Sequence, residues 1–178
     1  MKILFSADWH LGYTLSGANP AARLPDQARQ LSKIAAYCDE HAVDVLAIAG
    51  DVFEAQERGA ARAAVGAMMD ALAGPLSRGL RVVAVAGNHD RDYFMDMAGL
   101  WLGAHAPTGG ERIVMRTRPE LLTVEAKGER VNFALLPFPT LARYELKQTD
   151  PGGVAQRNEQ LAKLFIEKAE ELRKQASE

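Results

Sequence analysis

The stretch Val82–Asp90, VVAVAGNHD, decides the fold class of this chain. It begins as a run of small apolar and β-branched residues, breaks at Gly87, and ends in Asn88, His89 and Asp90. A near-continuous apolar run of this kind is typical of a strand that is buried on both faces of a parallel sheet. Ligands bind outside the carboxyl ends of such strands, so these polar residues lie where an α/β protein places its chemistry.

Two earlier segments repeat this design. The predicted strand Lys2–Ala7 is followed by Asp8 and His10, and the predicted strand Val43–Ala49 is followed by Asp51. In an extended segment, residues i and i+2 point the same way, so we expect Asp8 and His10 to bind the same metal ion. Carboxylate, imidazole and amide ligands without a thiolate suit manganese, iron or zinc better than copper. The three strand ends therefore predict a metal site.

The rest of the chain supports an α/β fold with a parallel sheet. We expect helices over Asp26–Ala42, Gly59–Leu72, Tyr93–Ala104 and Val154–Gln175, further strands over Leu80–Ala86 and Arg112–Arg116, and a hairpin of Leu121–Glu125 and Val131–Leu136. Leu15–Pro25, which contains glycine, asparagine and two prolines, is expected to be a loop, and Gly74-Pro75 is expected to weaken or end the second helix. Strands that alternate with helices in the first half indicate a sheet covered by helices.

Composition sets the limits of the function. The chain has 178 residues, enough for one domain, and a net charge of -2, which provides no global positive field for nucleic acid or membranes. Its one cysteine excludes an intrachain disulfide and a Cys-rich zinc site, as is typical of a reducing cytoplasm. The sequence shows no signal peptide and no apolar run of membrane-spanning length. We therefore expect a cytoplasmic protein.

Each motif alone also has an ordinary explanation. A glycine and an aspartate after a strand often form only a turn, and Asn88–Asp90 could be a loop with local capping. Three such motifs at the ends of three successive strands favour a site. Arg112, Arg116 and Arg118 could touch a phosphate backbone, but a solvated edge that deters strand pairing is the favoured interpretation.

The remaining aromatic and histidine residues are assigned structural places. Trp9 and Trp101 are expected in the core rather than as platforms for stacked bases. His105 lies in a stretch rich in glycine and proline and is expected to be solvated.

At these residues the chain resembles a known family. The segments that carry the resemblance are ADWHLG (Ala7–Gly12), AGDVFE (Ala49–Glu54), AGNHD (Ala86–Asp90) and LLPFP (Leu135–Pro139). In this order they resemble the calcineurin-like metallophosphoesterases, and their flanks resemble the branch of SbcD-type DNA repair exonuclease subunits. Glu54 stands where an aspartate is commoner in that branch.

The resemblance implies a fold and a site. The fold would be a four-layer αββα sandwich with two sheets inside. Asp8 and His10 would bind the first metal, Asp51 would bridge, and Asn88 would bind the second. His89 would be the catalytic histidine, with Asp90 orienting it. The cofactors would be two divalent ions, most often Mn²⁺, with iron, zinc or Mg²⁺ as alternatives.

The resemblance also implies an activity and partners. Two cations about 3.5–4 Å apart can clamp both oxygens of an in-line displacement at phosphorus, with a histidine as general acid or charge stabiliser. The expected function is a DNA nuclease that hydrolyses phosphodiester bonds at ends and hairpins in double-strand break repair. Its partners would be DNA, an SbcC-type SMC-like ATPase, and a second copy in a homodimer.

One departure qualifies these expectations. The family also uses histidines from two later motifs, Gly-His and Gly-His-x-His, and neither motif occurs in this chain. We therefore expect residues 1–178 to be the N-terminal part of the nuclease domain, lacking the C-terminal part of the fold, with weak metal affinity and an uncovered sheet edge. The alternatives are a small-substrate phosphodiesterase or phosphatase and a binding module with an incomplete metal site.

Overall fold

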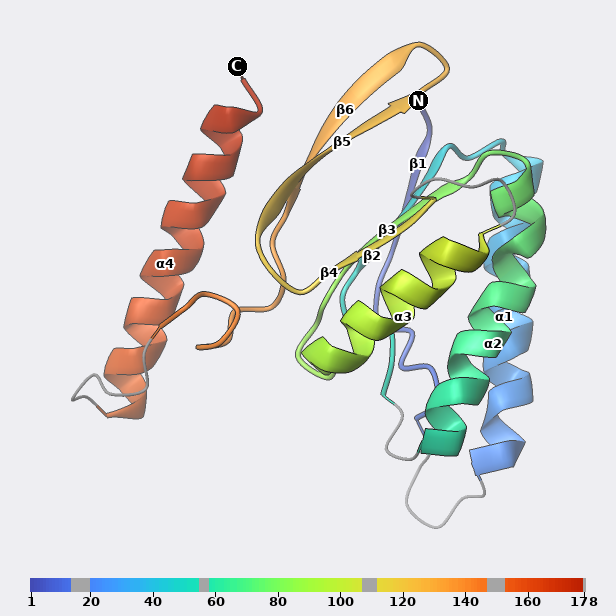
Figure 1. Cartoon of the computed structure of the whole chain (residues 1–178), viewed down its shortest axis with the longest axis horizontal. Coiled ribbons are helices and arrows are strands. Elements are labelled where there is room, and N and C mark those ends of the chain that lie inside the picture. The colour runs from blue at the N-terminus through green and yellow to red at the C-terminus, as the bar shows by residue number, and fades with distance from the viewer. Residues whose placement is uncertain (14–19, 55–57, 107–111, 147–152, 178) are drawn as a thin grey trace.

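The computed structural model describes residues 1–13, 20–54, 58–106, 112–146 and 153–177 (Figure 1). The elements follow in the order β1 (Ile3–Ser6), α1 (Pro20–Glu40), β2 (Val45–Ala49), α2 (Arg58–Ser77), β3 (Arg81–Val85), α3 (Asp92–His105), β4 (Ile113–Arg116), β5 (Glu120–Ala126), β6 (Glu129–Leu135) and α4 (Val154–Gln175). No described helix combines the length and the apolarity that a membrane-spanning segment needs.

The central sheet is parallel, and its strands are ordered β1-β2-β3-β4. Each crossover leads to the next strand in the same direction, and right-handed crossovers therefore place every connecting helix on the same face. Figure 1 shows α1, α2 and α3 together on that face. Leu31 of α1, Met68 of α2 and Met95 of α3 meet Leu46 and Val82 of the sheet in one buried cluster. The predicted α/β fold is confirmed.

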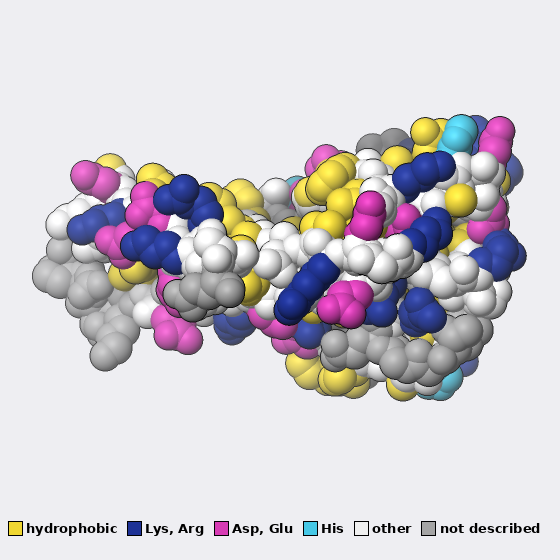
Figure 2. Space-filling view, turned by 90° about the horizontal axis from the view of Figure 1, so that it is seen from above, with side chains coloured by type: hydrophobic (Ala, Val, Ile, Leu, Met, Phe, Trp, Pro, Cys, Tyr) yellow, Lys and Arg dark blue, Asp and Glu magenta, His cyan; other side chains and the backbone are white. Residues whose placement is uncertain are grey.

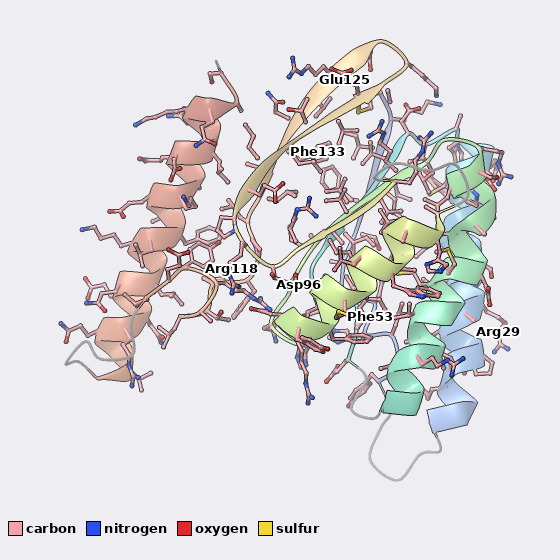
Figure 3. All side chains as sticks on the ribbon, viewed as in Figure 1. Arg29, Phe53, Asp96, Arg118, Glu125 and Phe133 are labelled. Atoms are coloured by element: carbon pink, nitrogen blue, oxygen red, sulfur yellow. The ribbon has the colours of Figure 1, made fainter. Side chains whose placement is uncertain are left out.

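The opposite face of this sheet is covered by the antiparallel hairpin of β5 and β6. Val45 and Val83 pack there against Val124 and Leu135, because successive residues of a strand point to opposite faces. Phe133, labelled in Figure 3, is packed against the same cluster. Two sheets therefore lie face to face.

Helix α4 forms the fourth layer, outside the hairpin (Figure 1). The Asn132 side-chain amide on β6 donates to the Ala176 carbonyl at the end of α4, at 3.1 Å. The rings of Phe165 and Tyr144 lie 5.8 Å apart, so α4 also contacts the segment that follows β6. The order helices, sheet, sheet, helix is that of the predicted αββα sandwich, with the second sheet reduced to two strands in the described residues.

The turn between β5 and β6 is built as the sequence predicts. Lys127 and Gly128 both have positive φ, at 52° and 79°, which is the conformation of a two-residue type I′ turn. The Lys127 ammonium reaches the buried Asp44 carboxylate at 2.7 Å, just before β2. This ion pair ties the tip of the hairpin to the parallel sheet.

Two predictions about helix boundaries were wrong. Helix α1 begins at Pro20, within the predicted loop Leu15–Pro25, of which residues 15–19 lie outside the described residues. A proline is well tolerated at the first helical position, because its missing N–H has no intrahelical partner there. Helix α2 continues through Pro75 to Ser77, because Leu76 belongs to the buried core. Tertiary packing outweighs the local breakers.

The predictions for the two tryptophans have different outcomes. Trp9 packs against the main core cluster, and its indole N–H donates to Ser6, as a core tryptophan requires. Trp101 is 45% exposed on α3 and stacks on His105 at 4.6 Å, so the prediction that it lies in the core was wrong. His105 is exposed as predicted, but it ends α3 rather than lying in a loop.

Candidate metal centre

The loops that follow β1 and β2 are joined by backbone hydrogen bonds at the carboxyl edge of the sheet. The amide of Asp8 donates to Gly50 at 3.2 Å, and that of His10 donates to Asp51 at 2.9 Å. Further along, Leu11 and Phe53 form an isolated parallel bridge. These bonds extend the pairing of the two strands into the loops and fix the backbone that carries the predicted ligands.

Three predicted ligands adopt the left-handed backbone conformation that only glycine adopts without strain. Asp8, His10 and Asp51 have φ values of 57°, 45° and 52°. Each such residue costs about 1–2 kcal/mol and persists only where the surroundings hold it. The segment from Asp8 to His10 is therefore not extended, and that expectation was wrong. The two side chains nevertheless converge, with His10 Nε2 3.8 Å from the nearer Asp8 oxygen.

The side chains form two clusters that share one histidine. Asp8, His10 and Asp51 each offer a ligand atom, and these atoms all lie within 4.8 Å of one another. His10, Glu54 and His89 form a second cluster by the same measure. Carboxylate oxygens and imidazole nitrogens at this spacing fit divalent first-row cations. The residues present thus suit the metal that the sequence predicts.

Glu54 is the site residue that sequence analysis missed. One carboxylate oxygen lies 2.8 Å from His10 Nδ1 and the other lies 3.0 Å from His89 Nδ1. The two imidazole rings meet edge to face, with centroids 5.1 Å apart. Glu54 follows Asp51 by three residues in the same loop and ends the segment AGDVFE, and these are the signals that the sequence offered for it.

The loop after β3 contacts the centre at Asp51, which lies in the loop after β2. One Asp51 carboxylate oxygen accepts the amide of His89 at 2.8 Å, while the residue itself is buried. This close approach requires Gly87, because a Cβ there would lie 2.2 Å from that oxygen. Asn88 is exposed in the same loop, beside His89. Its proposed role as a ligand of the second metal stays a prediction.

Asp90 lies buried between the loops that follow β2 and β3. Its buried carboxylate accepts backbone N–H groups from Val52, Phe53 and Gly87, at 3.1, 2.8 and 2.8 Å. Burial raises the pKa of Asp90 above its usual value, although these three hydrogen bonds oppose the shift. Asp90 joins the loops after β2 and β3, and the carboxylate beside the His89 ring belongs to Glu54. Any orienting effect of Asp90 on His89 would act through the backbone.

The arginines at the end of β4 have acidic partners. Arg116 pairs with Glu120 at 2.6 Å, and Arg118, labelled in Figure 3, pairs with Asp92 at the start of α3, at 3.0 Å. On the face shown in Figure 2, basic and acidic side chains are interspersed. These contacts favour the interpretation of Arg116 and Arg118 as paired surface residues over a phosphate-binding track.

Comparison with known proteins agrees with this site. Residues 1–144 match the family model of the calcineurin-like phosphoesterases. The chain is also similar to the SbcD subunit of the nuclease SbcCD of Bacillus subtilis (strain 168), with 32% identity over 151 residues. That alignment covers 80% of this chain and 35% of the relative, so the chain spans about a third of the relative's length.

Proposed function

This chain belongs to the calcineurin-like phosphoesterase family, and on that basis we propose that it carries metal-binding residues of a DNA nuclease that hydrolyses phosphodiester bonds. The observation that carries the proposal is the convergence of Asp8, His10, Asp51, Glu54 and His89 at the end of three parallel strands. The DNA substrate is supported by the similarity to a nuclease subunit.

The residues that would hold the metal ions follow from the two clusters. Asp8, His10 and Asp51 would hold one ion, most often Mn²⁺, and Asn88 would contribute to a second. When bound, such ions supply a hydroxide at neutral pH and neutralise charge on the phosphoryl group. In this proposal Asp51 bridges, since its carboxylate lies between the loops after β1 and β3.

His89 would transfer a proton to the leaving oxygen. Its side chain is 44% exposed, so a substrate can reach it. One Glu54 carboxylate oxygen lies 3.0 Å from His89 Nδ1, so the two groups form an ion pair when the ring is protonated, and Nε2 would be the nitrogen that gives the proton. Glu54 would thus orient the His89 ring directly, while Asp90, to which the family resemblance gives this role, would act through the backbone of the loop.

The proposal extends to the whole protein of which this chain would be a part. The further histidines that complete the family's site would come from chain beyond these residues, as would the contacts to an SbcC-type ATPase. The relative is about three times as long as the aligned segment, which leaves room for both.

The expected setting is the cytoplasm, where a single buried free cysteine such as Cys38 stays reduced.

Hydrolysis of a small chromogenic phosphodiester tests this function. We expect slow hydrolysis that requires Mn²⁺ and that duplex DNA blocks by competition, because both substrates need the same metal centre. Hydrolysis that DNA does not affect would instead indicate a small-substrate phosphodiesterase. A chain that binds no Mn²⁺ and hydrolyses nothing would contradict the proposal and favour a binding module.

Helix α3 supports the homodimer that belongs to this proposal. Its exposed apolar residues are Tyr93, Met97, Leu100 and Trp101. They recur at helical spacing, so they form one stripe along the outer face of α3, here called the α3 stripe. Contiguous exposed apolar surface on a folded protein marks an interaction site. A two-fold axis would place the same stripe of two copies together.

Leu100→Glu is expected to prevent this self-association. A charge within the α3 stripe at Leu100, which is 72% exposed, would be desolvated in the dimer but not in the monomer. Sedimentation velocity should then show the variant as a monomer at concentrations where the wild-type chain dimerises. Ile166→Glu on α4, at a similarly exposed position, is the matched control and should dimerise normally. A wild-type chain that stays monomeric would contradict this assignment.

A further inference from the structure

We propose that Arg143 is a positioning residue that holds the loop of Asn88 and His89 in place from behind. The inference rests on the proposed metal centre and adds a residue to it. Arg143 lies in the turn that follows β6, more than fifty residues beyond this loop, and its side chain is 3% exposed.

The Arg143 guanidinium donates to carbonyl groups on both sides of the two site residues. Nη1 reaches the carbonyl oxygens of Ala86 at 3.2 Å and of Gly87 at 2.8 Å. Nη2 reaches that of Asp90 at 2.8 Å. Asn88 and His89 lie between these acceptors, so the guanidinium fixes the backbone just before and just after them. Hydrogen bonds from a charged donor are roughly twice as strong as neutral ones.

The loop is thereby held from two directions. On one side, carboxylates accept its N–H groups, with Asp90 bound to Gly87 and Asp51 bound to His89. On the other side, Arg143 donates to its C=O groups. A loop whose N–H and C=O groups both have charged partners cannot shift without losing several hydrogen bonds at once. This arrangement presents Asn88 and His89 in one geometry.

The charge of Arg143 is compensated where the helix begins. Arg143 Nε donates to Asp92 at 2.7 Å, in the first turn of α3. Burial alone would raise the pKa of Asp92, but the hydrogen bonds from Arg143 and Arg118 outweigh it and lower the pKa. Asp92 therefore stays ionised, and a buried guanidinium with a partner can serve the loop without the penalty of an unpaired charge.

Lysine cannot replace this arginine. The guanidinium spreads its donors over a planar fork. Here the fork donates to the Asp92 carboxylate and to four backbone carbonyl groups, those of Ala86, Gly87, Asp90 and, at 3.1 Å, Phe138. A lysine ammonium has three donors at one point. Arg143→Lys therefore keeps the charge and loses the geometry. This substitution separates the positioning role from simple charge balance.

Three measurements on Arg143→Lys test the inference: urea unfolding, amide hydrogen exchange without metal, and Mn²⁺ binding by calorimetry. We expect exchange of the Gly87 and His89 amides to speed up by at least ~10-fold relative to amides of the β5–β6 hairpin. We expect the Mn²⁺ dissociation constant to rise by ~10–100-fold, as for other residues that orient metal ligands. Asp92→Asn, which weakens the support of Arg143 and also the surface pair with Arg118, should change both in the same direction by less.

Tyr144→Phe is the matched control. It removes the hydrogen bond from the Tyr144 hydroxyl to the Pro137 carbonyl in the same segment, without touching the loop of His89. We expect it to lower stability while leaving loop exchange and Mn²⁺ affinity near wild type. Unchanged loop exchange in Arg143→Lys, or equal changes in Tyr144→Phe, would overturn the positioning role. A wild-type chain without Mn²⁺ affinity would overturn the proposed metal centre instead, and exchange would still decide the role of Arg143.

Discussion

Replacing Asp51 with asparagine is expected to lower the affinity for Mn²⁺ by at least ~100-fold and to abolish metal-dependent hydrolysis. Loss of a residue that only orients a metal ligand lowers metal affinity by up to ~100-fold, and loss of a ligand itself should cost at least as much. The amide has nearly the shape of the carboxylate and can still accept the His89 N–H that Asp51 accepts at 2.8 Å. What disappears is the negative charge at the centre of the cluster with Asp8 and His10. The bridge between two cations that we propose for Asp51 would require that charge.

The same substitution should not destabilise the chain. Asp51 lies near Asp90, and its charge helps to raise the pKa of Asp90, so the two carboxylates repel each other when no metal is bound. Removing one of two buried like charges relieves that repulsion. We therefore expect the free energy of unfolding without metal to stay equal or to rise, while the stabilisation that Mn²⁺ gives the wild-type chain is lost.

Calorimetric titration with Mn²⁺ measures the change in affinity. Urea unfolding with and without Mn²⁺ measures the change in the free energy of unfolding. Asp70→Asn on the exposed face of α2 makes the same change of charge far from the site and is the control. It should bind Mn²⁺ as the wild-type chain does. An Asp51→Asn variant with unchanged Mn²⁺ affinity would show that this carboxylate is not a ligand.

The strand ends could be predicted from the sequence because two simple patterns coincide there. Apolar runs such as the one that ends at Ala86 identify buried parallel strands, and the polar residue that follows each run must lie at the same edge of the sheet. The structure brings Asp8, Asp51 and His89 together at that edge. It depends on topology and needs no knowledge of side-chain geometry.

Glu54 and Arg143 could not be predicted in the same way. Their roles depend on where loops run in space: Glu54 reaches back between two histidines, and Arg143 arrives from a turn beyond a second sheet. Arg143 has no local pattern that distinguishes it from a solvated surface charge, and Glu54 has only its place at the end of the segment AGDVFE. The left-handed backbone at His10 is equally hidden, because it is imposed by hydrogen bonds to the neighbouring loop rather than by glycine. Tertiary contacts decide all three.

Gly87→Ala is expected to disrupt the centre and to lower the free energy of unfolding by about 1–3 kcal/mol, the usual cost of overpacking a filled interior. A Cβ at Gly87 would lie 2.3 Å from the Asp51 amide nitrogen as well as 2.2 Å from its carboxylate oxygen. The nitrogen belongs to a backbone already fixed at positive φ, so it cannot give way as a flexible side chain would. The loops after β2 and β3 must therefore separate.

Separation of these loops breaks the contacts that hold Asp51 against the His89 amide, so the Mn²⁺ affinity should fall together with stability. Gly66→Ala is the matched control, because a Cβ at that position in α2 meets nothing within 4 Å. Alanine is the better helix former, and this control should gain about 0.5–1 kcal/mol with unchanged Mn²⁺ binding. Urea unfolding and calorimetry on both variants separate the two cases. If Gly87→Ala were as stable as Gly66→Ala and bound Mn²⁺ equally well, the two loops could not approach as closely as the structure shows, and the assignment of Asp51 to the centre would fail with them.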